Sequence, residues 1–298
     1  MDTPREFHYR LPGRVSGQRP GSHPGSSVGS GQEFVTHMSL YDRPDPRRLD
    51  LRASLRTLNG SWLVRVNRQR AGVAVRALVD VSASMSFGGQ RPKLHVVADF
   101  LEALGMSAFR VGDAVGMMAF DEVERSDLFM PARVSRGMGT IMASALRASD
   151  LSTPLAPRAV VRDSAHRSVT DGLEEAASHL AGQQGLIFLV SDFHWPLERL
   201  DVVLDLFAHS SVVPIVVWDP AETEPPERNS LASLRDAESG ARRTLWIRPK
   251  LRQDWRLAVA DRRSAIDRYF AARGIRPFYI EGVFDADSLS RYFFEADT

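Results

Sequence analysis

The chain of 298 residues contains no cysteine and only two lysines, Lys93 and Lys250. The absence of cysteine excludes disulfide bonds, thiolate zinc sites and a cysteine nucleophile. No apolar run approaches the roughly 18 residues of a membrane-spanning helix, and the N-terminus lacks the apolar segment of a secretory signal. These absences predict a cytoplasmic protein that inserts no segment into a membrane.

An excess of charge of one sign is also lacking. The formal net charge is +1, so no global field marks a nucleic-acid or membrane binder. Three enzyme motifs are missing: the phosphate-binding G-x-x-x-x-G-K-[ST], the hydrolase elbow G-x-S-x-G and the zinc-binding H-E-x-x-H. The hydrophobic content of 43% and charged content of 25% are typical of a globular protein.

The composition divides the chain into three parts. Residues 1–32 are rich in Gly, Ser and Pro and carry several arginines, which predicts a flexible basic arm. Residues 33–72 place Asp and Arg around Pro and end in the strand-like "SWLVRVNRQ". We expect this part to be an N-terminal extension that packs on the main domain. Residues 73–298 are expected to form that main domain.

From residue 73 onward, strand-like runs alternate with helical patterns. Nearly continuous apolar runs, typical of strands buried on both faces, cover residues 73–80, 113–121, 185–193 and 211–219. Further strands are expected at 242–249 and 275–282, and helical spacing of apolar residues is clear over 91–110. The repeated strand–helix units predict an α/β fold with a doubly wound, mostly parallel sheet.

Oxygen-bearing side chains gather where two of these strands end. Asp80, Ser82 and Ser84 follow the run "VRALV", Asp192 follows "IFLVS", and Thr170 opens the predicted helix "TDGLEEAASHLAG". Because the carboxyl ends of parallel strands lie at one edge of a sheet, we expect these five side chains to converge. Carboxylate and hydroxyl oxygens suit a hard divalent cation, Mg²⁺ first, with Mn²⁺ or Ca²⁺ as alternatives. The set contains neither thiolate nor imidazole, which argues against zinc.

Structural roles for the hydroxyl groups stay open at this point. Ser82 and Ser84 can equally be turn or N-cap residues, and Thr170 can simply cap its helix. Thr140, in "GMGTIMASAL", is a second candidate for the threonine, because a glycine-threonine pair before a helix is another familiar context for this ligand. The short stretch of chain between Thr170 and Asp192 favours Thr170.

These residues resemble the metal-ion-dependent adhesion site of the von Willebrand factor A fold. The string "DVSAS" matches its D-x-S-x-S, Thr170 falls where its threonine would lie, and Asp192 in "LVSDF" matches its last acid. Over residues 29–282 the strings "GSGQEF", "YDRPDPRRLDLRASLR", "GDAVGMMAFD" and "VVWDPAETEPP" are similar to a bacterial family of A-domain proteins encoded beside MoxR-type AAA+ ATPases. One departure is Leu51, which follows Asp50 where that family usually has tryptophan.

The resemblance implies an adaptor or assembly factor and no enzyme. It implies that the metal at the adhesion site binds a carboxylate of a client protein, and that the chain works with a MoxR-type AAA+ ATPase. The start of the chain is most similar to family members from methanol-oxidation gene clusters, so that the client enzyme implied by the resemblance is methanol dehydrogenase.

Two other functions remain as alternatives. A metal-assisted hydrolase or phosphatase would use Asp80, but Ser82 stands where such enzymes need a second carboxylate. Nucleic-acid binding would use the basic arm, in which Phe7 and Tyr9 stand beside arginines as in a stacking site. The balanced net charge argues against this second alternative, so we expect no nucleic-acid partner.

Overall fold

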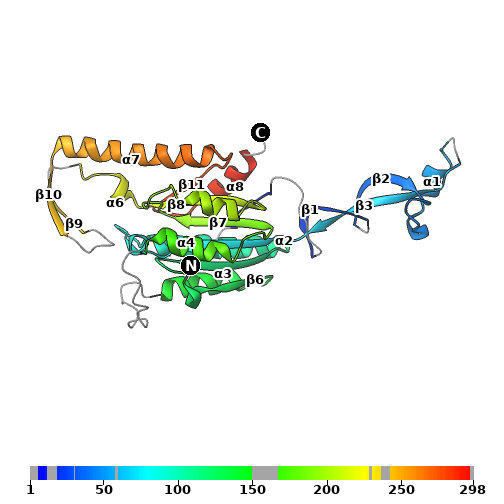
Figure 1. Ribbon diagram of the computed structural model, residues 1–298, viewed down its shortest axis with the longest axis horizontal. Helices are drawn as coiled ribbons and strands as arrows, with labels where there is room; N and C mark the ends of the chain where they lie inside the picture. The colour runs from blue at the N-terminus through cyan, green and yellow to red at the C-terminus, as the bar shows by residue number, and fades with distance from the viewer. Residues whose placement is uncertain are drawn as a thin grey trace.

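The computed structural model describes residues 6–11, 19–29, 31–57, 60–149, 167–227, 230–235 and 242–295. A body built on a six-stranded sheet makes up most of the described chain. A separate three-stranded sheet, here called the N-terminal sheet, extends away from one end of that body (Figure 1).

The central sheet is mostly parallel, and its strand order is β11-β8-β7-β4-β5-β6. Its strands are β4 (Ala74–Asp80), β5 (Ala114–Phe120), β6 (Met130–Arg133), β7 (Gly185–Ser191), β8 (Ser210–Trp218) and β11 (Phe278–Glu281). Only β6 runs antiparallel to its neighbour. Strands β5 and β7 are buried along their whole length, which explains their continuous apolar sequences.

Helices cover both faces of this sheet. One face packs against α2 (Lys93–Val111), α3 (Met138–Ala148) and α8 (Ala286–Glu295), and the other against α4 (Val169–Ser178), α5 (Leu200–Leu206) and α7 (Pro249–Ala271). Strand β4 serves both cores because successive side chains point to opposite faces: Val75, Ala77 and Val79 join the first core and Leu78 joins the second. The predicted α/β fold with a doubly wound, mostly parallel sheet is confirmed.

Two strands differ from the prediction. The strand expected at 242–249 is β10 (Arg242–Ile247), but it pairs with β9 (Ser230–Arg235) in a separate antiparallel hairpin. The short β6, which contains Pro131, was not predicted, and it closes one edge of the central sheet. Proline is tolerated there because an edge strand has one side without ladder hydrogen bonds.

The N-terminal sheet consists of β1 (Pro20–Gly29), β3 (Leu63–Ala71) and β2 (Glu33–Ser39), in that order and antiparallel. The short helices η1 (Pro46–Arg48) and α1 (Leu51–Ser54) lie in the connection from β2 to β3. Val64 and Val66 are buried, in agreement with the alternating pattern of this strand. Residues 33–72 thus contribute two strands to a sheet that projects from the body, which differs from the expected packing of an extension on the main domain (Figure 1).

The structure also differs from a flexible arm over residues 1–32 wherever it describes them. Phe7 is 2% exposed and its ring packs near Phe100 and Phe188 in the first core. Tyr9 donates to the Asp113 carboxylate at 2.5 Å, and strand β1 follows at Pro20. The average composition of this part concealed two aromatic side chains whose burial offsets the entropy of ordering the chain. Residues 1–5, 12–18 and 30 lie outside the described residues.

Asp113 joins three segments at the junction between the body and the N-terminal sheet. Its Oδ2 accepts hydrogen bonds from Tyr9 and contacts His23 Nε2 of β1 at 2.7 Å. Its Oδ1 accepts from the backbone N–H of Val73, which links β3 to β4, at 2.8 Å. Asp113 is fully buried, and these contacts satisfy both of its oxygens.

Candidate metal centre

Four of the five predicted ligands meet at the carboxyl ends of β4 and β7. Asp80 is the last residue of β4 and Asp192 directly follows β7, and both are fully buried. Because β4 and β7 are adjacent and parallel, their ends lie side by side. Ser82 directly precedes the turn η2 (Ala83–Ser86), and Ser84 lies within it. This turn lies between β4 and α2.

Hydrogen bonds connect Asp80 with Ser82 and Ser82 with Ser84, and Ser191, the neighbour of Asp192 in the chain, also bonds to Asp80. Oδ1 of Asp80 accepts from the backbone N–H of Ser82 at 2.9 Å, and the hydroxyl oxygens of Ser82 and Ser84 lie 3.2 Å apart. Ser84 also helps to lower the pKa of the Asp192 carboxyl. The other oxygen of Asp80 accepts from the Ser191 hydroxyl at 2.6 Å and from the Trp195 indole N–H at 3.1 Å. The result is an oxygen cluster that contains four of the five predicted side chains and also Ser191, which was not predicted.

Thr170 is buried at the second position of α4, but its contacts are different. Its hydroxyl lies 2.7 Å from the Ser168 hydroxyl and accepts from Arg199 at 3.4 Å. Among the described residues it has no hydrogen bond to the four clustered side chains. Ser168 rather than Thr170 caps the helix, in a capping box with Asp171. Thr170 as a metal ligand, and the choice between it and Thr140 in α3, therefore stay predictions.

A buried ammonium group, which was not predicted, lies beside Asp192. Lys93 is 1% exposed, and its Nζ lies 2.8 Å from Asp192 Oδ2 and 2.8 Å from Glu222 Oε1. Glu222 belongs to the short helix α6 (Pro220–Thr223), and His194 Nε2 stands 3.8 Å from its other oxygen. The available signal was the rarity of lysine, because Lys93 is one of only two lysines in the chain and stands four residues after the glycine pair Gly88–Gly89.

Burial and charge separate the two aspartates. Burial, and next the charge of Asp192, raise the pKa of Asp80 to about 6. Burial alone would raise the pKa of Asp192 too, but the Lys93 ammonium, with His194, outweighs this and lowers the pKa below its usual value. Asp192 therefore keeps its negative charge, and Asp80 is the group that takes up a proton when no cation is bound.

The cluster fits a hard divalent cation. Asp80, Asp192 and Glu222 oppose the single ammonium of Lys93, so the formal charge is two negative when all three acids are ionised. The oxygens that line it belong to carboxylates and hydroxyls, the ligand types of Mg²⁺, Mn²⁺ and Ca²⁺. No group of three or more His, Cys, Asp or Glu side chains suited to a metal is present in the described ranges. A cation here would accordingly depend on the hydroxyls.

We expect Asp80→Ala to lower the free energy of unfolding by an amount that depends on pH in EDTA-containing buffer. Because the folded-state pKa is raised, the folded protein binds more protons than the unfolded chain between pH 4 and 6, and wild-type stability falls over that window. The destabilisation caused by Asp80→Ala should therefore shrink by about 2.4 kcal/mol from pH 4 to pH 7.5. Urea unfolding of both proteins across this range measures it, and a constant difference would contradict the raised pKa.

The family and relatives of the chain were identified by comparison. The model of the family described as "Protein of unknown function DUF58" matches residues 42–265. An uncharacterized protein of Mycobacterium tuberculosis is 28% identical over 231 residues, which are 75% of this chain and 66% of that protein. The chain thus spans just under two-thirds of the length of this relative. An "Uncharacterized protein in moxR 3'region" of Paracoccus denitrificans is 30% identical over 104 residues, 35% of this chain and 99% of that protein.

The chain is also similar to several solved structures at low sequence identity. An aerotolerance-related membrane protein from Bacteroides fragilis is 16% identical, with a TM-score of 0.45, over 76% of this chain and 98% of that chain. A von Willebrand factor type A protein from Catenulispora acidiphila is 11% identical, with a TM-score of 0.36, over 77% and 43%. Proximal thread matrix protein 1 from the mussel byssus, with a zinc-occupied MIDAS motif, is 16% identical, with a TM-score of 0.32, over 49% and 38%.

The prediction of a cytoplasmic protein is corrected by these comparisons. The matched structure from Bacteroides fragilis is that of a membrane protein, so the cytoplasmic assignment is withdrawn. Within the described residues, no helix has the length and apolar character needed to cross a bilayer. The prediction failed because it inferred location from the lack of an apolar run, and this lack does not determine where a protein resides.

Proposed function

Because the chain belongs to the DUF58 family of proteins of unknown function, we propose for it a role rather than a reaction: a metal-dependent protein-binding adaptor. The observation that carries the proposal is the convergence of Asp80, Ser82, Ser84 and Asp192 at the ends of two adjacent strands. These residues, with Thr170 as the proposed fifth ligand, would hold Mg²⁺ or a similar cation. When bound, the cation supplies an electrophilic centre for a carboxylate oxygen of the partner protein.

The hydrogen bonding of Asp80 supports binding over catalysis. A hydrolase that used this carboxylate as a nucleophile would need an oxygen able to approach the substrate. Both oxygens already accept hydrogen bonds, one from Ser82 and the other from Ser191 and Trp195. The side chain is also fully buried. An adaptor needs no such freedom, because the protein ligands only hold the cation.

The proposed partner is a MoxR-type AAA+ ATPase. The support is the resemblance of the motifs to proteins encoded beside such ATPases and the relative from the moxR 3' region of Paracoccus denitrificans. The finer proposal is that the chain corresponds to MxaS of methanol-oxidation gene clusters and that methanol dehydrogenase is the client, supplying the carboxylate. This finer proposal rests on the resemblance of the N-terminal strings alone.

The hydroxyl groups allow a test that leaves the buried acids intact. We expect the double variant Ser82→Ala/Ser84→Ala to weaken Mg²⁺ binding at least about tenfold in calorimetry, because a cluster without hydroxyls offers too few oxygen ligands. Ser86→Ala is the matched control, since Ser86 stands on the same turn and its buried hydroxyl has no hydrogen-bond partner. Equal Mg²⁺ binding by all three proteins would refute the metal site.

The same variants test the partner. Pull-down of the MoxR-type ATPase should succeed with wild type and Ser86→Ala and fail with the double variant, all in the presence of Mg²⁺. The experiment uses these variants instead of EDTA, because EDTA would also remove the Mg²⁺ that an AAA+ ATPase needs for its own nucleotide. Loss of Mg²⁺ binding with retention of the ATPase would show that the partner docks on another surface.

A further inference from the structure

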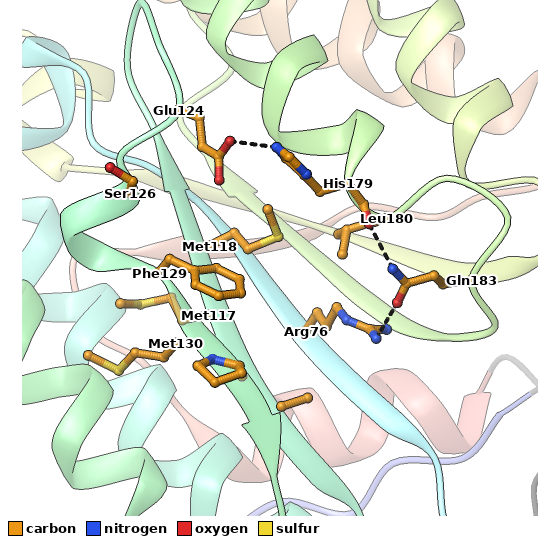
Figure 2. A pocket seen from close by; sticks show the side chains of 13 residues that line it. Arg76, Met117, Met118, Glu124, Ser126, Phe129, Met130, His179, Leu180 and Gln183 are labelled. Carbon is orange, nitrogen blue, oxygen red and sulfur yellow. Dashed lines mark hydrogen bonds and ion pairs between the residues drawn. The ribbon is translucent and has the colours of Figure 1, made fainter.

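A cavity of about 440 Å³ lies on the sheet face that carries α4, away from the candidate metal centre. Its lining comes from β4, β5 and β6 and from the turn after α4, with Arg76, Met118, Phe129 and Leu180 among the side chains (Figure 2). Arg76 precedes Asp80 on β4 by a distance of about 13 Å along the strand. The volume is in the range of pockets that hold small molecules.

Arg76 contributes a cation that has no acidic partner among the described residues. Its Nη2 donates to the Gln183 side-chain carbonyl at 2.5 Å, whereas its Nη1 is buried without any hydrogen-bond partner. Burial lowers the pKa of Arg76, with no offset from a neighbouring carboxylate in the part of the chain that the structure describes. A buried donor without a partner on a charged group is unusual and calls for a bound species.

Arg125, which is more deeply buried than Arg76, has different partners. Arg125 is 4% exposed, and its guanidinium is paired with Asp127 at 2.9 Å and with Asp121 at 3.1 Å. Arg147 likewise pairs with Asp99 and Glu102. Arg125 and Arg147 thus each have two carboxylate partners, whereas Arg76 has none among the described residues. The Arg76 guanidinium can therefore accept a counter-ion from outside the chain.

The remaining lining defines the rest of the occupant. Met118, Phe129, Met130 and Leu180 form apolar walls, and Phe129 is half exposed (Figure 2). Methionine side chains adapt to ligands of irregular shape. The one acidic side chain of the lining, Glu124, is paired with His179 at 2.9 Å. The unbalanced charge of the cavity is thus positive and stands beside an apolar wall.

We propose that this cavity binds a small apolar carboxylic acid, with its carboxylate on Arg76 and its hydrocarbon part against Met118, Phe129 and Leu180. The carboxylate supplies the acceptor that the buried Nη1 lacks, and the hydrocarbon part removes apolar surface from water. The site is separate from the proposed adaptor site, so that the two proposals stand or fall independently.

Octanoate is the probe, and octan-1-ol is its neutral counterpart. In calorimetry with the full chain, octanoate should bind and octan-1-ol should bind at least about tenfold more weakly, because only octanoate makes a charge-assisted hydrogen bond to Arg76. Equal affinity for the two would overturn the proposal, as would the absence of octanoate binding. A short peptide that ends in Leu tests the other source of an apolar carboxylate. Tighter binding of this peptide than of octanoate would overturn the small acid in favour of a protein C-terminus.

Variants locate the site. Arg76→Met should weaken octanoate at least about tenfold, whereas Arg133→Met, on the exposed side of β6, should leave its affinity within about twofold. Ala132→Trp fills the cavity and should abolish binding, which keeps the test decisive should Arg76→Met fail to fold. Octanoate affinity that is unchanged in the Arg76 and Ala132 variants would place the ligand elsewhere and refute the assignment.

Discussion

Replacing Lys93 by Met is expected to destabilise the protein by about 3–5 kcal/mol, because it leaves Asp192 and Glu222 without their shared cation. Met retains most of the apolar volume of the lysine side chain, so the loss reports the charge rather than a cavity. Part of the loss should return when Mg²⁺ is added, since a cation in the proposed site also neutralises Asp192. Chemical unfolding with EDTA and with Mg²⁺ measures both effects.

Lys250→Met is the matched control for this experiment. Lys250 is the other lysine of the chain, it is exposed in the first turn of α7, and its substitution should change stability by no more than about 0.5 kcal/mol. A Lys93→Met protein as stable as the control would show that Asp192 and Glu222 do not depend on the ammonium for charge compensation.

Phe7→Ala is expected to cost about 3–5 kcal/mol, although residue 7 lies in a stretch whose composition suggests a free arm. The ring fills space between α2 and the central sheet, with ring centroids 6.1 Å from Phe100 and 6.2 Å from Phe188. Its removal leaves a cavity that the surrounding rings cannot close. Urea unfolding followed by circular dichroism would measure the loss.

Phe109→Ala provides the comparison, because Phe109 is 41% exposed on α2 and should change stability by only about 0.5 kcal/mol. Equal, small effects of the two substitutions would mean that the N-terminal segment does not stabilise the body. Strong protection of residues 6–11 from hydrogen exchange in the wild type would agree with the large effect.

The strands β4, β5, β7 and β8 of the central sheet were predictable because they are largely buried on both faces and their sequences are nearly continuously apolar. The positions of Asp80 and Asp192 followed from the same logic, since parallel strands bring their carboxyl ends to one edge. The features that were not predicted depend on contacts between segments that are distant in the sequence. Lys93 looks like any helical lysine until Asp192 and Glu222 are placed beside it. The pairing of β10 with β9 rather than with the central sheet has no local signal either.

The N-terminal segment shows a different reason for failure. Gly, Ser and Pro dominate its composition, but two aromatic side chains decide its position, because each buries far more apolar area than the small residues around it. The burial of Phe7 and Tyr9 and the contacts of Asp113 hold the segment against the body. The average composition of a segment does not reveal such contacts of individual side chains.

The connection between β3 and β4 has a mechanical consequence. Only Gly72 and Val73 separate the two strands, so the chain from Leu63 to Asp80 is a nearly unbroken link of roughly 60 Å between the N-terminal sheet and the oxygen cluster. A pull on the N-terminal sheet along β3 would load β4 lengthwise. Since β4 is hydrogen-bonded to β5 and β7 on both sides, these bonds would be sheared together rather than opened one by one. The tension would reach its far end at Asp80, the residue whose position defines the cation site.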